Sequence, residues 1–192
     1  MSTRLLVPYQ EARPRIRDAD LLLFRRRGLI AAVGRGIHSH AAMAAWWGGD
    51  LFCLEVREWY GGRAVTLSSQ VLRRPGQIDV YHVTPWSAIS SQQSADIRHH
   101  AARWMRRLCG TPYGYLGILE AALYHAPLVR CLVPPQTDDT ATSTHPPFCS
   151  QAIAMAYRLG GGVDPVPGLA DRITEPADLA RSSLFGYAFT IQ

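Results

Sequence analysis

Short apolar runs separated by turn residues fill the stretch from residue 20 to residue 83, and this pattern constrains the fold more than any other feature. Such runs between turn residues are typical of β-strands. The GGD at 48–50 and the RRPG at 73–76 predict tight turns, and strands joined this closely favour an antiparallel sheet. The alanines of the second run would also suit a helix. We expect strands over residues 20–24, 39–47, 51–56, 64–67 and 78–83.

The spacing of apolar residues changes to a helical period after residue 90. We expect helices over 90–108, 115–124 and 148–159, with glycines after the first and the last of them as stop signals. The remaining expectations are a short helix or turn over 29–36, a Pro- and Thr-rich loop over 134–147 and a last strand over 187–191.

The chain is long enough to bury one hydrophobic core, because it has 192 residues of which 47% are hydrophobic. We expect an irregular arm rich in Arg and Pro over residues 1–17 and a single domain over residues 18–192. The predicted fold class is α+β, with a central antiparallel sheet packed against helices.

All 20 basic residues are arginine, and the net charge is +5. This charge suits an anionic partner such as a polymer or a membrane surface, although a solubilising surface explains it more simply. The arginine runs lack the interleaved aromatic residues of a nucleic-acid platform, so we expect no nucleic-acid partner. No apolar run is as long as a signal peptide or a membrane span. We expect a soluble protein made in the cytoplasm, and leave open its delivery to the cell envelope by a phage particle or a secretion system.

Cys149 is the strongest candidate for chemistry. Four cysteines occur, at positions 53, 109, 131 and 149, and none form a CxxC pair. Cys149 follows a Pro-Pro-Phe sequence and opens a predicted helix. Backbone N–H groups in a first helical turn would lower the pKa of a thiol and could hold an oxyanion. The competing interpretation is a small apolar core residue.

A reactive thiol needs a base, and His40 and His38 are the candidates. His40 lies at the start of a predicted strand, and His38, two residues earlier, would share its side of a strand, so their spacing does not choose between them. Glu55 follows the predicted hairpin turn and would lie beside the His40 strand, where a carboxylate could orient an imidazole. The alternative for Glu55 is an exposed position on an edge strand.

Five stretches of the chain resemble, in order, the circularly permuted NlpC-type papain-like cysteine hydrolases of the YiiX/YebB-like group. In this group the strand with the histidine precedes the helix with the cysteine, as it does here. The resemblance covers about residues 15 to 160. The five stretches are DADLLLF at 18–24, SHAAM at 39–43, LEV at 54–56, PYGYLGI at 112–118 and FCSQAIAMAYR at 148–158.

The resemblance implies that Cys149 is the nucleophile, that His40 rather than His38 is its base, and that Glu55 orients the base. It also implies that Tyr115, or else Tyr113, lies near the substrate cleft. We place Ser39 and Ser150, the sequence neighbours of His40 and Cys149, in the substrate pocket. Ala41-Ala42, Gly114 and Gln151 depart from the residues often found at their positions in the group.

The activity that the resemblance implies is cleavage of an amide bond through a thioester, and we expect the substrate to be bacterial cell-wall peptidoglycan. One alternative is an acyltransferase or a lipid amide or ester hydrolase on the same fold. Another is a non-catalytic binding or structural component, for example of a phage tail or a secretion machine. We expect no cofactor and no metal, because the HSH at 38–40 and the His pair at 99–100 lack the spacing of known metal motifs.

Overall fold

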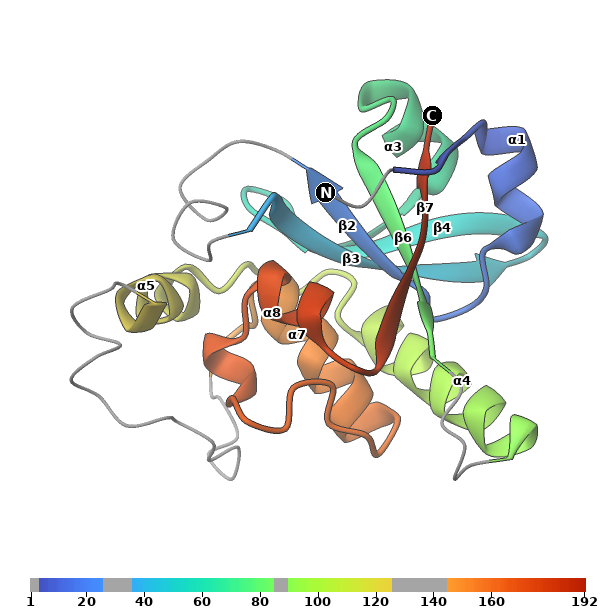
Figure 1. Cartoon of the computed structure of the whole chain (residues 1–192). Helices are drawn as coiled ribbons and strands as arrows, with labels where there is room; N and C mark the ends of the chain where they lie inside the picture. The colour runs from blue at the N-terminus through green and yellow to red at the C-terminus, as the bar shows by residue number, and fades with distance from the viewer. Residues whose placement is uncertain (1–3, 26–35, 85–89, 126–144) are drawn as a thin grey trace.

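The computed structural model describes residues 4–25, 36–84, 90–125 and 145–192, in which helices cover both faces of a β-sheet (Figure 1). The sheet has seven strands in the order β1-β7-β6-β2-β3-β4-β5. Neighbouring strands are antiparallel except β1 and β7. The predicted α+β class is therefore confirmed. The strands are β1 (Leu6–Val7), β2 (Leu21–Arg25), β3 (His38–Trp47), β4 (Asp50–Arg57), β5 (Gly61–Thr66), β6 (Ile78–Val83) and β7 (Phe185–Ile191).

The hairpin between β3 and β4 depends on two glycines. Trp47 pairs with Asp50, so Gly48 and Gly49 alone form the turn. Both have a positive φ, +59° and +87°, as a two-residue turn of type I′ requires and as side-chain-bearing residues rarely adopt. The predicted turn is confirmed. The alanine-rich segment before it is a strand rather than a helix.

The helices lie in two groups, one on each face of the sheet. Figure 1 shows α1 and α3 on one side and α4, α7 and α8 on the other. A capping box between Ser90 and Gln93 starts α4. In the part of the chain that the structure describes, no helix is both long enough and apolar enough to cross a membrane. The helices are α1 (Tyr9–Ala12), η1 (Arg13–Arg15), α3 (Leu67–Arg73), α4 (Ser91–Arg107), α5 (Tyr115–His125), α7 (Cys149–Met155), η2 (Ala156–Gly160), η3 (Asp171–Ile173) and α8 (Pro176–Arg181).

Strand β2 is buried on both faces and joins two hydrophobic cores. Leu21 and Leu23 belong to the core shared with α4, α7 and α8, whereas Leu22 and Phe24 belong to the core shared with α1 and α3. This alternation is the two-residue period of a strand. All four side chains are fully buried, and each contributes about 1.5–3 kcal/mol of hydrophobic stabilisation.

The strands do not follow one another across the sheet as a simple meander would. β5 ends at Thr66, and Leu67 begins α3, so the strand expected over 64–67 is wrong at its last residue. β6 then pairs with β2 instead of β5. The local pattern identified most strands, but their order depends on α3, which carries the chain back across the sheet.

The N-terminal segment is not the irregular arm that we expected over residues 1–17. Leu6 and Val7 form β1, which pairs in parallel with Thr190 and Ile191 of β7. Ile16 is buried in the core on that side of the sheet. The segment therefore completes the sheet edge. The helix or turn expected over 29–36 and the loop expected over 134–147 lie largely outside the described residues.

Candidate active site

Cys149 is the first residue of α7, and its sulfur lies against β3. The helix continues directly into η2. The imidazole of His40 and the backbone N–H groups of Ala41 and Ser150 lie beside the sulfur, and their hydrogen-bonding contacts lower the pKa of the thiol. Only 2% of Cys149 is exposed. The thiol is thus buried among polar partners as well as apolar ones.

His40 and Glu55 meet Cys149 where two neighbouring strands stop pairing. The register between β3 and β4 runs from Trp47 and Asp50 to Met43 and Leu54. His40 precedes the last pair and Glu55 follows it, while β4 continues to pair with β5 as far as Arg57. Helix α7 contacts both β3 and β4. The end of the β3–β4 pairing therefore leaves room for the three side chains.

The side chains form a row of thiol, imidazole and carboxylate. His40 Nε2 lies 2.7 Å from Glu55 Oε2, which leaves Nδ1 for the sulfur of Cys149. The Glu55 side chain is fully buried, and 13% of the His40 side chain is exposed. The Phe24 ring packs on the imidazole with its centroid 5.2 Å away. This arrangement can hold a thiolate and an imidazolium side by side.

The pKa values of the three groups are shifted toward their charged forms, although burial opposes this in each case. Burial raises the pKa of Glu55, but the hydrogen bonds from His40 and Arg63 outweigh it and lower the pKa to about 2. Burial lowers the pKa of His40, but the bonds to Cys149 and Glu55 raise it to about 9. Burial raises the pKa of Cys149, and the bond to His40 together with two backbone N–H groups lowers it below its ordinary value.

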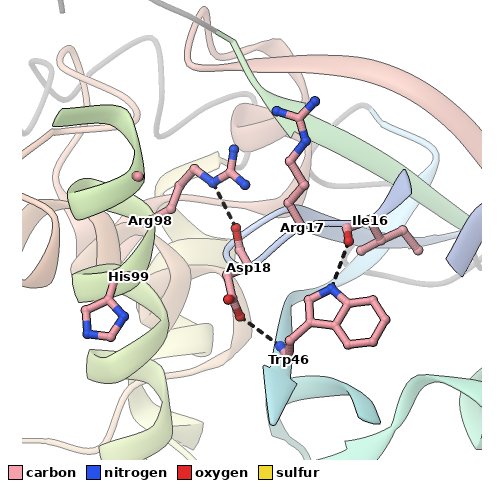
Figure 2. Close-up of a pocket in the computed structure, with 7 residues that line it drawn as sticks. Ile16, Arg17, Asp18, Trp46, Arg98 and His99 are labelled. Carbon is pink, nitrogen blue, oxygen red and sulfur yellow. Dashed lines mark hydrogen bonds between the residues drawn. The ribbon is translucent and has the colours of Figure 1, made fainter. Parts of the chain in front are cut away.

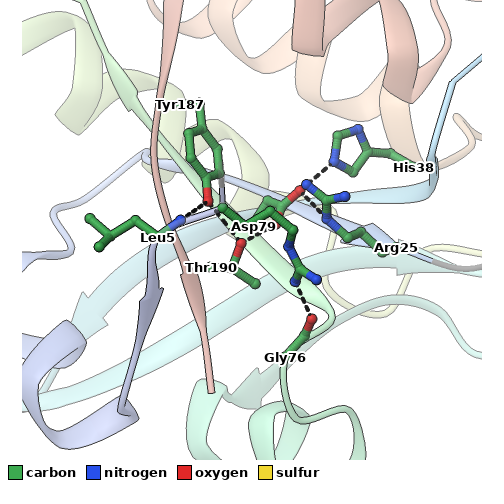
Figure 3. A network of polar contacts seen from close by, with 8 residues as sticks. Leu5, Arg25, His38, Gly76, Asp79, Tyr187 and Thr190 are labelled. Atoms are coloured by element: carbon green, nitrogen blue, oxygen red, sulfur yellow. Dashed lines mark hydrogen bonds and ion pairs between the residues drawn. The ribbon is translucent and has the colours of Figure 1, made fainter. Parts of the chain in front are cut away.

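His38 takes part in a different network and does not bond to Cys149. Its Nε2 lies 2.7 Å from Asp79 Oδ2, which Arg25 also contacts at 2.6 Å. Thr190 donates to the other oxygen of Asp79 at 2.6 Å. Figure 3 shows these side chains converging on Asp79 from β2, β3 and β7. The structure thus brings His40, and not His38, to the thiol. His38 belongs instead to a network around Asp79 that connects β2, β3, β6 and β7.

Of the two tyrosines, Tyr113 is the one that packs against Cys149. Burial, followed by the charge of Cys149, raises the pKa of Tyr113. Tyr115 packs against Tyr113 with ring centroids 4.9 Å apart, and 46% of it is exposed. The structure therefore places Tyr113 in the cluster that holds Cys149 and places Tyr115 on the more exposed side of Tyr113.

The two serines expected in the substrate pocket differ in burial. Ser150 is fully buried, and its Oγ has no hydrogen-bond partner among the described residues. Its backbone N–H, rather than its hydroxyl, reaches the sulfur. Ser39 is partly exposed and lies between His38 and His40 on β3. Only Ser39 therefore has a side chain open to solvent.

Gly114 and Gln151, which differ from the residues often found at their positions in the group that the sequence resembles, have a physical reason in this chain. A Cβ atom on Gly114 would lie 2.0 Å from the backbone oxygen of Pro146, so only glycine fits between α5 and the segment before Cys149. The backbone N–H of Gly114 also donates to Pro147 O at 3.2 Å. The Gln151 side chain accepts from the backbone N–H of Phe148 at 3.4 Å and caps α7. Both residues help to fix the start of the helix that carries the thiol.

A hollow of about 340 Å³ lies at another place in the fold, between the end of β3 and α4 (Figure 2). Asp18 accepts from the backbone N–H of Trp46 at 2.8 Å, and Arg98 donates to the backbone oxygen of Asp18 at 3.2 Å. None of the proposed site residues line this hollow. Its polar groups connect the segment before β2 to α4.

Comparison with known proteins shows that the fold of this chain is similar to that of a solved structure. No family model matches the chain, and no curated protein does. The chain is similar in structure to the metalloprotein yiiX from Escherichia coli O157:H7, described as DUF1105, with a TM-score of 0.62 and 12% identity. The similarity covers 91% of this chain and 97% of that one. It supports a distant relation in fold to the YiiX-like group.

The name of that neighbour raises the question of a metal here. Among the described residues, no group of three or more His, Cys, Asp or Glu side chains could hold a metal ion. The two histidines of the HSH sequence turn to different carboxylates, His38 to Asp79 and His40 to Glu55. The donor set that the structure describes does not fit a metal centre.

Proposed function

We propose that this protein is a cysteine hydrolase with a permuted papain-like catalytic domain, which cleaves an amide bond through a thioester. The observation that carries the proposal is the row of Cys149, His40 and Glu55, in which the imidazole bonds to the carboxylate and lowers the pKa of the thiol. A nucleophile, a base and a group that orients the base are what such a reaction needs. The likeness of fold to yiiX adds support for the YiiX-like part of the resemblance.

The reaction begins with the proton of Cys149 on His40. The thiolate attacks the carbonyl carbon of the substrate, and backbone N–H groups at the start of α7 stabilise the oxyanion. Imidazolium His40 then gives its proton to the leaving amine, the C–N bond breaks, and a thioester remains. His40 takes a proton from water, the hydroxide attacks the thioester, and the acid leaves as the thiol forms again. Glu55 keeps the imidazole oriented throughout.

The substrate that we propose is the peptide part of peptidoglycan, with no cofactor. This choice rests on the family resemblance and on the net charge of +5, which suits an anionic wall. Release beside the wall by a phage particle or a secretion machine would bring the enzyme to this substrate. Incubation with purified peptidoglycan and separation of the soluble fragments tests the proposal. New amine ends should appear with the wild-type protein and be absent with Cys149→Ala.

A thiol-reactive probe tests the nucleophile without knowledge of the substrate. Iodoacetamide at about pH 6.5 should label Cys149 rapidly, because only a thiol with a lowered pKa is ionised there. Burial raises the pKa values of Cys53 and Cys109, so both should react slowly. Cys149→Ala measures the background, and His40→Gln should slow the labelling. Equal labelling of wild type and Cys149→Ala would rule out the hydrolase and favour a binding or structural role.

One observation favours the acyl-lipid alternative as a second candidate. Helix α5 has a single charged residue, Glu120, and its Leu116, Leu119 and Leu123 are 56–66% exposed. Tyr115, on the same helix, connects this apolar face to the aromatic residues of the site. An exposed apolar surface of this kind suits a hydrophobic substrate.

A parallel assay separates the two substrates. The wild-type protein is incubated with a fatty-acyl amide, with a phospholipid and with peptidoglycan fragments under the same conditions. Loss of lipid activity in Leu119→Ser, with unchanged iodoacetamide labelling of Cys149, would favour the acyl-lipid reaction. Cleavage of peptidoglycan fragments alone, with the same rate in the variant, would exclude it.

A further inference from the structure

We propose that Arg63 is a positioning residue of this site, which holds Glu55 ionised and turned toward His40. The inference rests on the proposed function, because it assigns a role in the same thiol chemistry. Sequence reasoning did not select Arg63, which is one of 20 basic residues that are all arginine. The contacts of its guanidinium set it apart.

Arg63 and His40 divide the two oxygens of Glu55 between them. The Oε1 atom of Glu55 accepts from Arg63 Nε at 2.9 Å and from Arg63 Nη2 at 2.6 Å. The Oε2 atom faces His40 Nε2 at 2.7 Å. Two guanidinium nitrogens that donate to one oxygen hold that oxygen more firmly than a single donor does. With Oε1 held, Oε2 is directed at the imidazole.

The position of Arg63 is itself fixed by its surroundings. Arg63 pairs directly with Glu55 across β4 and β5, and its guanidinium lies over the Tyr60 ring at 4.1 Å from the centroid. Gly62, just before it, donates its backbone N–H to Thr111 O at 2.8 Å. A Cβ atom on Gly62 would lie 1.8 Å from the Leu108 backbone oxygen, so β5 packs closely on the end of α4. This packing keeps the guanidinium beside the carboxylate.

Arg57 provides a matched comparison on the same carboxylate. Its Nη1 lies 3.7 Å from Glu55 Oε1, beyond the length of a hydrogen bond. The side chains of Arg57 and Arg63 are exposed to similar extents, 23% and 21%. The two arginines thus differ mainly in whether they bond to Glu55. Removal of either takes one positive charge from the neighbourhood, but only removal of Arg63 frees the carboxylate.

The consequence for the thiol has a definite sign. Without Arg63, the pKa of Glu55 rises toward its ordinary value, and Oε2 is no longer held at His40. The imidazolium then stabilises the thiolate less, and one nearby cation has gone, so the pKa of Cys149 rises. A salt bridge that serves stability alone would change the melting temperature and leave the pKa of Cys149 unchanged.

The test is the pH dependence of iodoacetamide labelling of Cys149 in the full chain, with thermal unfolding recorded for each variant. Arg63→Met should move the acid limb of the profile upward by about one pH unit, so that labelling below the limb slows roughly tenfold. Arg63→Lys, which keeps the charge but not the fork, should recover part of the rate. Arg57→Met should change the rate by less than about threefold.

The outcomes separate this inference from the proposed function. If the wild type and His40→Gln give the same pH profile of labelling, the proposed function itself is contradicted. If His40→Gln changes the profile but Arg63→Lys and Arg63→Met both give the wild-type profile, only the role of Arg63 is overturned. An equal shift in Arg57→Met also overturns it, because general charge would then explain the effect. If Arg63→Met does not fold, Arg63→Lys against Arg57→Met decides the question in the same way.

Discussion

Glu55→Gln is the substitution that probes the row of charges most sharply, because it removes one charge and keeps the shape of the side chain. A rise in the pKa of His40 from 6.5 to about 9 corresponds to roughly 3 kcal/mol in favour of the imidazolium. Cys149 and Glu55 both contribute to this rise. A charged hydrogen bond contributes about 1.5–3 kcal/mol. The loss of Glu55 should therefore remove about half of the free energy that favours the imidazolium of His40.

The expected result is a pKa of His40 about one unit lower in Glu55→Gln than in the wild type. The pKa is raised in the folded protein, so the imidazolium exists below about pH 9 and is lost as the pH rises through that value. NMR titration of the histidine Cε1–H signals measures this directly, and His40→Gln identifies the signal. A pKa of His40 that is equal in the wild type and in Glu55→Gln would refute the ion-pair reasoning.

Two further substitutions test the surroundings of the site. Gly114→Ala places a Cβ against Pro146 O and should lower the free energy of unfolding by about 1–3 kcal/mol. It should also slow the labelling of Cys149. Urea unfolding and labelling that both match the wild type would contradict this expectation. Asp79→Asn weakens the contacts of a buried carboxylate with His38 and Arg25 and should lower stability by up to about 3–5 kcal/mol. Labelling of Cys149 in the folded Asp79→Asn variant should remain within about twofold of the wild type, and a larger loss would show that the His38 network acts on the thiol.

The ionisation of Glu55 should make the stability of the protein depend on pH in acid. Its pKa in the folded protein is about 2, below the ordinary 4.5. Its ionised contacts therefore contribute stability that is complete above about pH 4.5 and is lost as the pH falls toward 2. In Glu55→Gln, stability measured by urea unfolding should depend less on pH over this range. An unchanged pH dependence would show that Glu55 is not ionised by its partners.

The sequence predicts best those parts of the molecule that local chemistry determines. Two adjacent glycines set the turn between β3 and β4, since few other residues adopt their positive φ angles. The Pro-Pro-Phe sequence before Cys149 marks the start of a helix because proline suits a helix entry and not a helix interior. Both features depend on residues close together in the chain.

Features that depend on distant partners could not be predicted in the same way. Leu6 and Val7 form a strand only because β7 lies beside them, more than 180 residues later. His38 and His40 have the same local pattern, and they differ because Asp79 approaches one and Glu55 the other. Arg63 gave no signal, since its partner across the sheet is known only once the register of β4 and β5 is fixed.

The most direct test of the central claim is the thiolate absorbance near 240 nm, followed against pH as the difference between the wild type and Cys149→Ser. We expect this absorbance to appear below pH 8.5, the ordinary pKa of a cysteine, and we expect His40→Gln to move it to higher pH. A thiol that ionises only at or above its ordinary pKa, with or without His40, would contradict the claim that these two residues form an ion pair.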